Sequence, residues 1–336
     1  MRSKNILIIK LGALGDVVLS TPQLTRLMEV HTGDRVTLLT APAYVELVAG
    51  LPLQVVAFPR KGFVAMLRVV RWLLGQHFDV VYDLQGSARS RVMLLLTQAG
   101  KRVGRSHGIA YTHTPPATTD RVHAFDRLND ILIAGGIEAA PPILQLPVSA
   151  IVASGVTAWI QQQGLAGRRL VLMHAGCSQH WPAKRWNEAH YQTLSSCIEA
   201  RGFVVIWIGG EDERALNSRL ASHTGVDATA AFSLAELLAL AGHAAFAVSN
   251  DSGPMHVLSA AGLPVYAFFG PTDWQRSHAL GQAARVLVNP VPCSPCQLPV
   301  CPPQHRHACL QGITPATVLA RLEADGLLQA LPEPHQ

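Results

Sequence analysis

The sequence predicts an α/β protein with two domains, each built around a parallel sheet. Short apolar strands alternate with amphipathic helices in both halves of the chain. Several strands end in polar, glycine-bearing turns, as expected for doubly wound sheets, which bind ligands at the carboxyl ends of their strands. The length of 336 residues, 49% of them apolar, exceeds the usual size of one domain.

The first half is expected to form a doubly wound domain over residues 1–150. Its opening strand, Ile6 to Lys10, leads through a glycine-rich turn into a helix from about Val17 to Val30. The turn lacks the dinucleotide fingerprint, because Leu14 stands where G-x-G-x-x-G requires glycine. The elements expected next are Arg35 to Thr40, Tyr44 to Ala49, Leu53 to Phe58, Gly62 to Gln76, Phe78 to Leu84 and His123 to Gly135.

A domain boundary is expected between Ile137 and Gly167, where proline, small residues and glycine accumulate. A second parallel-sheet domain follows over residues 168–312, and the two domains are expected to face each other across a cleft. The last segment, residues 313–336, carries a terminal helix. The elements expected after the boundary are Leu170 to His174, Asn187 to Arg201, Phe203 to Ile208, Glu211 to Ser222, Leu234 to Ala241, Ala244 to Ser249, Val265 to Phe269, Val286 to Val288 and Thr314 to Leu328.

Composition narrows the class of partner. A net charge of +5 with only 15% charged residues favours an acidic substrate or an anionic membrane face. Nucleic-acid binding is not expected, because dense Lys/Arg stripes with interleaved aromatics are missing from the sequence. The apolar strands are far shorter than the ~20 residues of a spanning helix, and the N-terminus does not resemble a signal peptide. We therefore expect a cytoplasmic protein. Its positive charge leads us to expect, in addition, peripheral docking at the cytoplasmic face of the inner membrane.

Polar residues follow two strands of the first half. Asp16 stands at the start of the first helix, where it either caps free N–H groups or presents a carboxylate that can accept a proton. Gln85 and Arg89 follow the strand that ends at Leu84. They are expected at the mouth of this domain, where Arg89 either meets an anionic acceptor or belongs to an ordinary surface helix.

Three strand ends converge in the second half. Lys184 lies just before a helix and suits a diphosphate, although a surface lysine is an equally good interpretation. Glu211 suits ribose hydroxyls or a first-turn helix position. In the third turn, Ser252 and Gly253 provide a hydroxyl and bare N–H groups for phosphate oxygens, and Asp251 is able to accept hydrogen bonds from sugar hydroxyls.

These motifs resemble those of glycosyltransferase family 9, the heptosyltransferases of the lipopolysaccharide inner core. The resemblance rests on segments spread from the first strand to residue 273. Within the segment Asp251 to His256, Pro254 and Met255 depart from the commoner wording Asp-Thr-Gly-Leu-Ser-His and have no assigned role. The matching segments are Ile8 to Asp16 with Thr21-Pro22, Asp83 to Gly86, Ala183 to Trp186, Gly209 to Glu211, Asp251 to His256 and Phe269 to Asp273.

The resemblance implies a GT-B fold of two Rossmann-like domains, with acceptor binding in the first and nucleotide-sugar binding in the second. It implies inverting transfer of heptose from ADP-heptose to a lipid A-Kdo type acceptor, with no cofactor required for catalysis. The terminal segment is then expected to cross back to the first domain. A transferase or epimerase that uses another nucleotide-sugar is the alternative. The implied roles are Asp16 as general base, Lys184 on the diphosphate, and Glu211, Asp251, Ser252, Gly253 and His256 around the nucleotide-sugar.

A cysteine-rich segment precedes the terminal helix. Four of the six cysteines lie here, with spacing that suits a structural tetrahedral site for zinc or iron. The alternative is a loop of reduced, free thiols, since six cysteines in a cytosolic chain do not indicate a disulfide framework. The candidate ligands are Cys293, Cys296, Cys301 and Cys309.

Overall fold

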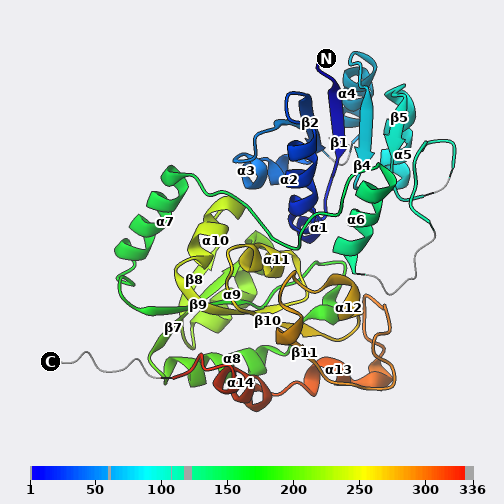
Figure 1. Cartoon of the computed structure of the whole chain (residues 1–336). Helices are drawn as coiled ribbons and strands as arrows, with labels where there is room; N and C mark the ends of the chain where they lie inside the picture. The colour runs from blue at the N-terminus through cyan, green and yellow to red at the C-terminus, as the bar shows by residue number, and fades with distance from the viewer. Residues whose placement is uncertain (1, 60–61, 107, 117–122, 330–336) are drawn as a thin grey trace. The chain divides into compact units, whose positions relative to one another are not determined.

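The computed structural model describes residues 2–59, 62–106, 108–116 and 123–329. The chain divides into two compact units, Met1–Pro147 and Val148–Gln336, which we describe separately. Each unit contains one parallel sheet with helices on both faces (Figure 1), so the predicted α/β architecture is confirmed. The expected return of the terminal segment to the first domain stays a prediction.

The N-terminal unit has a five-stranded sheet in the order β3-β2-β1-β4-β5. Every pairing in it is parallel. The strand order reverses between β1 and β4, and ligands of open α/β sheets bind at such a switch point, outside the carboxyl ends of the strands. The strands are β1 (Asn5–Ile9), β2 (Arg35–Thr40), β3 (Gln54–Ala57), β4 (Val80–Asp83) and β5 (Lys101–Val103).

Two apolar clusters cover this sheet. One contains residues of α2 and α6, and the other contains residues of α4 and α5, so these helix pairs lie on opposite faces. The helices are α1 (Leu14–Leu19), α2 (Thr21–Val30), α3 (Val45–Val48), α4 (Phe63–Leu74), α5 (Ala88–Leu96) and α6 (Ala124–Ala134), with a 3-10 turn η1 (Pro42–Tyr44).

Two expectations for this unit differ from the structure. The single helix expected from Val17 to Val30 is two helices that meet at Ser20, because Pro22 has no N–H to continue the first one. The basic segment that begins at Lys101, for which no strand was expected, forms the edge strand β5. Its three residues are too few and too polar to show strand alternation.

The C-terminal unit has a six-stranded parallel sheet in the order β11-β10-β9-β6-β7-β8. The order reverses between β6 and β9, so the turns after these two strands meet at the switch point. The edge strand β8 was not expected from the sequence, because it is short and contains Asp227. The strands are β6 (Arg169–His174), β7 (Phe203–Gly209), β8 (Val226–Thr229), β9 (Ala244–Asn250), β10 (Val265–Phe269) and β11 (Val286–Val288).

Helices cover both faces of this second sheet (Figure 1). Residues of α8, α9, α13 and α14 share one large aromatic-rich cluster, and α10 packs between α7 and α11. Among the residues that the structure describes, none of the helices combines the length and apolar character of a membrane-spanning segment. The helices are α7 (Ala150–Gln162), α8 (Glu188–Glu199), α9 (Arg214–Ala221), α10 (Leu234–Ala241), α11 (Gly253–Ala260), α12 (Trp274–Ser277), α13 (Ala308–Gln311) and α14 (Pro315–Ala324), with 3-10 turns η2 (Pro182–Lys184), η3 (Glu211–Glu213), η4 (Ala283–Arg285) and η5 (Pro303–His305).

Candidate functional site

The switch point of the N-terminal sheet holds a polar pocket of about 200 Å³. Residues from the turns after β1 and β4 meet here with residues of α1 and α6. A carboxylate and three cations share the lining. The lining residues are Lys10, Asp16, Leu19, Leu84, Gln85, Gly86, Arg105, Ala124, Arg127, Leu128 and Ile131.

Asp16 occupies the first turn of α1 with its side chain exposed to the pocket. One carboxylate oxygen, Oδ2, accepts a hydrogen bond from the Ala13 N–H at 3.2 Å. The capping role and the presented carboxylate are therefore compatible, because a single oxygen accepts the capping hydrogen bond while the residue lines the pocket. This geometry suits a base that accepts a proton from a bound hydroxyl.

The cations of this pocket come from three different elements. Lys10 is buried at the end of β1, and its Nζ donates to the Leu84 carbonyl at 3.1 Å. Burial lowers the pKa of Lys10, while the negative charges of Asp16 and Asp83 oppose that shift. Arg105 follows β5, and Arg127 projects from α6. A pocket with this balance favours an anionic ligand.

The two expected acceptor contacts, Gln85 and Arg89, each line a cavity of the N-terminal unit. Gln85 lines the polar pocket, and its Oε1 accepts from the Leu11 N–H at 2.8 Å. Arg89 lines a different, very small cavity with Leu11, Met66 and others. Only Gln85 therefore shares a pocket with Asp16.

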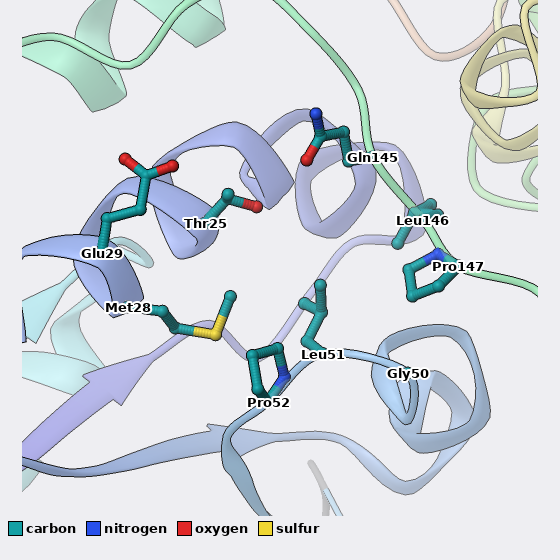
Figure 2. Close-up of a pocket in the computed structure, with 9 residues that line it drawn as sticks. All are labelled: Thr25, Met28, Glu29, Gly50, Leu51, Pro52, Gln145, Leu146 and Pro147. Atoms are coloured by element: carbon teal, nitrogen blue, oxygen red, sulfur yellow. The ribbon is translucent and has the colours of Figure 1, made fainter. Parts of the chain in front are cut away.

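A larger hollow of about 570 Å³ lies in the same unit, and apolar side chains dominate its walls (Figure 2). Its charged member, Glu29, is paired with Arg26 at 3.1 Å. Pro147 packs directly against Gly50: a Cβ added to this glycine would lie 2.4 Å from the proline Cγ. Its mainly apolar walls make this hollow a less suitable site for an anionic ligand than the Asp16 pocket. It is lined by Thr25, Met28, Glu29, Gly50, Leu51, Pro52, Gln145, Leu146 and Pro147.

In the C-terminal unit, Lys184 and Asp251 come together from separate strand ends. Lys184 closes the turn η2, and its Nζ lies 2.7 Å from Asp251 Oδ2. The same carboxylate oxygen accepts from the Thr272 hydroxyl at 2.6 Å. Asp251 is buried, whereas Lys184 remains partly exposed. The ammonium is thus held at the strand ends and is accessible to an anion.

The turn after Asp251 starts helix α11. Ser252 is the N-cap residue, and Gly253 is the first helical residue. Pro254 lies in the first turn, where its missing N–H costs nothing. Met255 and His256 are both buried in the unit. Residues 252 and 253 therefore present the helix N-terminus, which favours phosphate oxygens, while Met255 has a packing role.

The side chains of Glu211 and Glu213, both in η3, point in different directions. Glu211 is exposed and forms a two-point ion pair with Arg214, which lowers the pKa of Glu211. Glu213 turns inward, and its Oε2 accepts from the Gly210 N–H at 2.7 Å. Gly176 leaves room for it, since a Cβ there would lie 2.2 Å from Glu213 Oε1. No local pattern distinguishes Glu213 from Glu211 in the sequence, because both residues follow the same strand.

His174 ends β6 and was not singled out from the sequence. Its Nδ1 lies 3.1 Å from the Ser252 Oγ, and its Nε2 lies 4.0 Å from Glu213 Oε1. Burial, assisted by the charge of Arg185, lowers the pKa of His174 to about 4. The ring is therefore neutral at pH 7 and contacts the N-cap residue of α11.

Asn250 joins the turns at the switch point of the C-terminal sheet. Its Nδ2 donates to the carbonyls of Ala175 and Gly176 at 2.8 and 2.9 Å. Its Oδ1 accepts from the Trp186 N–H at 2.9 Å and from the Tyr191 hydroxyl at 3.2 Å. The buried amide thereby fixes the segments on either side of Lys184.

The four clustered cysteines are reduced, with Cys309 buried and the other three half-buried. Burial raises the pKa of the Cys309 thiol, and the nearby charges of Cys301, Cys293 and Cys296 raise it further. Nevertheless, no group of three His, Cys, Asp or Glu side chains among the described residues is placed to hold a metal ion. The four thiols are neighbours, but they do not converge as a tetrahedral site requires.

The sequence profile of glycosyltransferase family 9 (heptosyltransferase) matches residues 66–307. Lipopolysaccharide heptosyltransferase 1 of Pseudomonas aeruginosa is 26% identical over 364 residues, covering 95% of this chain and 97% of that relative. Lipooligosaccharide heptosyltransferase 2 of Haemophilus influenzae is 28% identical over 134 residues, but that match covers only 38% of this chain and 39% of the relative.

Solved structures share the fold over almost the whole chain. A glycosyltransferase of family 9 from Veillonella parvula has a TM-score of 0.83 and 20% identity, with 97% of each chain covered. The ADP-heptose heptosyltransferase II of E. coli has a TM-score of 0.76 and 22% identity, covering 96% of this chain and 98% of that one. TibC, an iron-containing dodecameric glycosyltransferase of enterotoxigenic E. coli, has a TM-score of 0.61 and 17% identity, covering 96% and 76%. The expected GT-B fold is therefore confirmed.

Proposed function

Because the chain belongs to glycosyltransferase family 9, we propose that it is an inverting heptosyltransferase that transfers heptose from ADP-heptose to the lipopolysaccharide inner core. The observation that carries this proposal is the pocket of the N-terminal unit, where the Asp16 carboxylate shares one lining with Lys10, Arg105 and Arg127. An acceptor sugar acid such as Kdo has a carboxylate for the cations and a hydroxyl for the base. The N-terminal unit is then the acceptor-binding domain.

The C-terminal unit is proposed to bind the donor. The N-terminus of α11, at Ser252 and Gly253, offers N–H groups to the diphosphate, and Lys184 adds a positive charge. Asp251 and His256 border the same turn. Glu211 lies in η3, just after β7, where its pairing with Arg214 must loosen before it can hold ribose hydroxyls.

The proposed reaction is a single displacement. The acceptor hydroxyl oxygen forms a bond to C1 of heptose while the bond from C1 to the β-phosphate oxygen breaks. The hydroxyl proton passes to Asp16, and the bonding electron pair leaves with ADP. Charge that develops on the diphosphate is stabilised by N–H groups and the Lys184 ammonium, so the step requires no catalytic metal.

The base assignment is tested with Asp16→Asn. Asparagine keeps a side-chain oxygen for the Ala13 N–H, so the fold and the affinity for ADP are expected to be retained. Turnover should fall roughly a hundredfold or more, since the variant cannot accept the proton. Glu29→Gln, which removes a surface carboxylate of the same unit, is the matched control. Full activity of Asp16→Asn would contradict the assignment.

The donor class is tested by thermal shift with ADP-sugars and UDP-sugars. We expect protection by ADP-heptose and by ADP. Protection by UDP-sugars alone would instead favour the alternative, a GT-B transferase or epimerase that uses another nucleotide-sugar.

The enzyme is proposed to work in the cytoplasm, at the inner face of the inner membrane where its lipid-linked acceptor lies.

A structural metal at the cysteine segment is a separate proposal. Its support is the set of four neighbouring thiols, which suits zinc or iron, although their present positions would have to adjust. Elemental analysis of the purified protein should find metal that Cys296→Ser removes and Cys197→Ser, at a distant cysteine, retains. Metal-free wild-type protein would reject this proposal and leave the transferase proposal intact.

A further inference from the structure

Helix α4 of the N-terminal unit carries apolar side chains on both of its faces. Val69 and Leu73 point into the core of the unit. On the outward face, Phe63, Leu67 and Leu74 are 73%, 51% and 58% exposed. Their spacing of four and seven residues places them on one side of the helix. The outward face of α4 therefore carries a stripe of exposed apolar side chains.

The neighbouring helix extends this surface. Helix α5 packs against α4, and their inward residues share one apolar cluster. On α5, Val92 and Leu95 are exposed, as are Val64 and Met66 on α4. Scattered exposed apolar residues are ordinary, but a group on adjoining helices marks an interaction surface. We call this group the α4–α5 surface: Phe63, Val64, Met66, Leu67, Leu74, Val92 and Leu95.

The charges around the α4–α5 surface have one sign. Arg68 and Arg71 of α4 and Arg91 of α5 are exposed, and neither helix contains an acidic residue. An apolar face on two helices that carry exposed arginines and no acidic residue complements an anionic lipid bilayer, in which headgroup phosphates lie directly above the acyl chains.

The α4–α5 surface adjoins residues expected to meet the acceptor. Met66 of α4, Arg89 of α5 and Leu11 line one small cavity, and the Leu11 N–H is bonded to Gln85, which lines the pocket of Asp16. The apolar surface and the polar pocket are thus linked within one unit through a shared cavity and one hydrogen bond.

We propose that the α4–α5 surface docks onto an anionic lipid bilayer, with Phe63, Leu67 and Leu74 entering the boundary between headgroups and acyl chains. Arg68 and Arg71 then lie at the phosphates. The consequence for catalysis rests on the proposed function: a docked enzyme meets a lipid-linked acceptor next to Gln85 without extracting it from the bilayer.

Vesicle co-sedimentation tests the surface. The probes are vesicles of phosphatidylcholine alone and of phosphatidylcholine with phosphatidylglycerol. Wild-type protein should sediment with the anionic vesicles, and less so as salt is raised. The variants Phe63→Ser/Leu67→Ser and Arg68→Gln/Arg71→Gln should each partition roughly tenfold more weakly. Ile133→Ser is the matched control, because Ile133 is exposed on α6, across the sheet from α4.

Three results would overturn the proposal. The first is that the wild-type protein fails to sediment with anionic vesicles. The second is that the α4 variants sediment as well as the wild type. The third is that light scattering finds a self-associating wild type and a monomeric Phe63→Ser/Leu67→Ser variant. The surface would then join copies of this chain. Circular dichroism should show that the variants are folded, because the substituted side chains are exposed.

Activity on two acceptors separates this proposal from the transferase proposal. With a water-soluble, deacylated acceptor, Phe63→Ser/Leu67→Ser should transfer heptose at the wild-type rate. With an acceptor embedded in anionic vesicles, it should be roughly tenfold slower. Equal rates on the embedded acceptor would contradict bilayer docking. If neither acceptor is modified by the wild type while vesicle binding persists, the transferase proposal fails and the docking surface stands.

Discussion

The neutral state of His174 predicts a distinctive pH dependence of stability. Burial lowers its pKa to about 4, against an ordinary value of 6.5. Between these values the unfolded chain binds a proton that the folded chain does not, so stability is complete above about pH 6.5 and is lost as pH falls towards 4. This gap corresponds to roughly 3 kcal/mol. In His174→Asn, which cannot titrate, that loss should disappear.

The assay is urea unfolding of both proteins from pH 7.5 to 4.5, followed by tryptophan fluorescence. All tryptophans except Trp72 belong to the C-terminal unit, so the signal reports mainly the unit that contains His174. Burial raises the pKa of Glu213, which opposes the trend in both proteins; the difference between them isolates the histidine. His243→Asn, at an exposed histidine of the same unit, is the control. Parallel pH profiles for wild type and His174→Asn would refute a neutral His174.

Three further substitutions have defined expectations. Lys184→Gln removes the cation 2.7 Å from Asp251, so the Kd for ADP by calorimetry should rise roughly tenfold; an unchanged Kd would remove Lys184 from the donor site. Arg127→Gln should raise the acceptor KM in steady-state kinetics about tenfold, since it loses one cation of the Asp16 pocket, and a change in ADP affinity instead would relocate its role. Asn250→Ala removes the side-chain amide, so the buried groups that bond to its nitrogen and to its oxygen are left unpaired. The free energy of unfolding should therefore fall by roughly 3 kcal/mol, and the Tm by about 6 °C or more. A Tm equal to that of the wild type would show that Asn250 does not hold the turns together.

Much of the fold followed from local patterns. Apolar strands that end in polar turns predicted both sheets, and the strand ends pointed to Lys184 and Asp251 at one edge of the second sheet. Their actual ion pair depends on the adjacency of β6 and β9, strands far apart in the sequence. The short edge strands β5 and β8 were missed because neither is long enough to show a periodic pattern.

The sites were less predictable because they depend on side-chain direction. Arg127 reaches the Asp16 pocket from α6, and no local motif marks it. Glu211 and Glu213 are two residues apart in a 3-10 turn, yet one is exposed and the other faces His174. By contrast, Met255, which had no role in the sequence motif, is explained by burial in the core.

Analysis of the transfer product tests the central claim most directly. Wild-type protein is incubated with ADP-heptose and a Kdo-terminated inner-core acceptor, and the product is examined by mass spectrometry and NMR. We predict that ADP is released only when the acceptor is present and that the product carries one added heptose with inverted anomeric configuration. Retained configuration, or the absence of heptose transfer to any inner-core acceptor, would contradict the account.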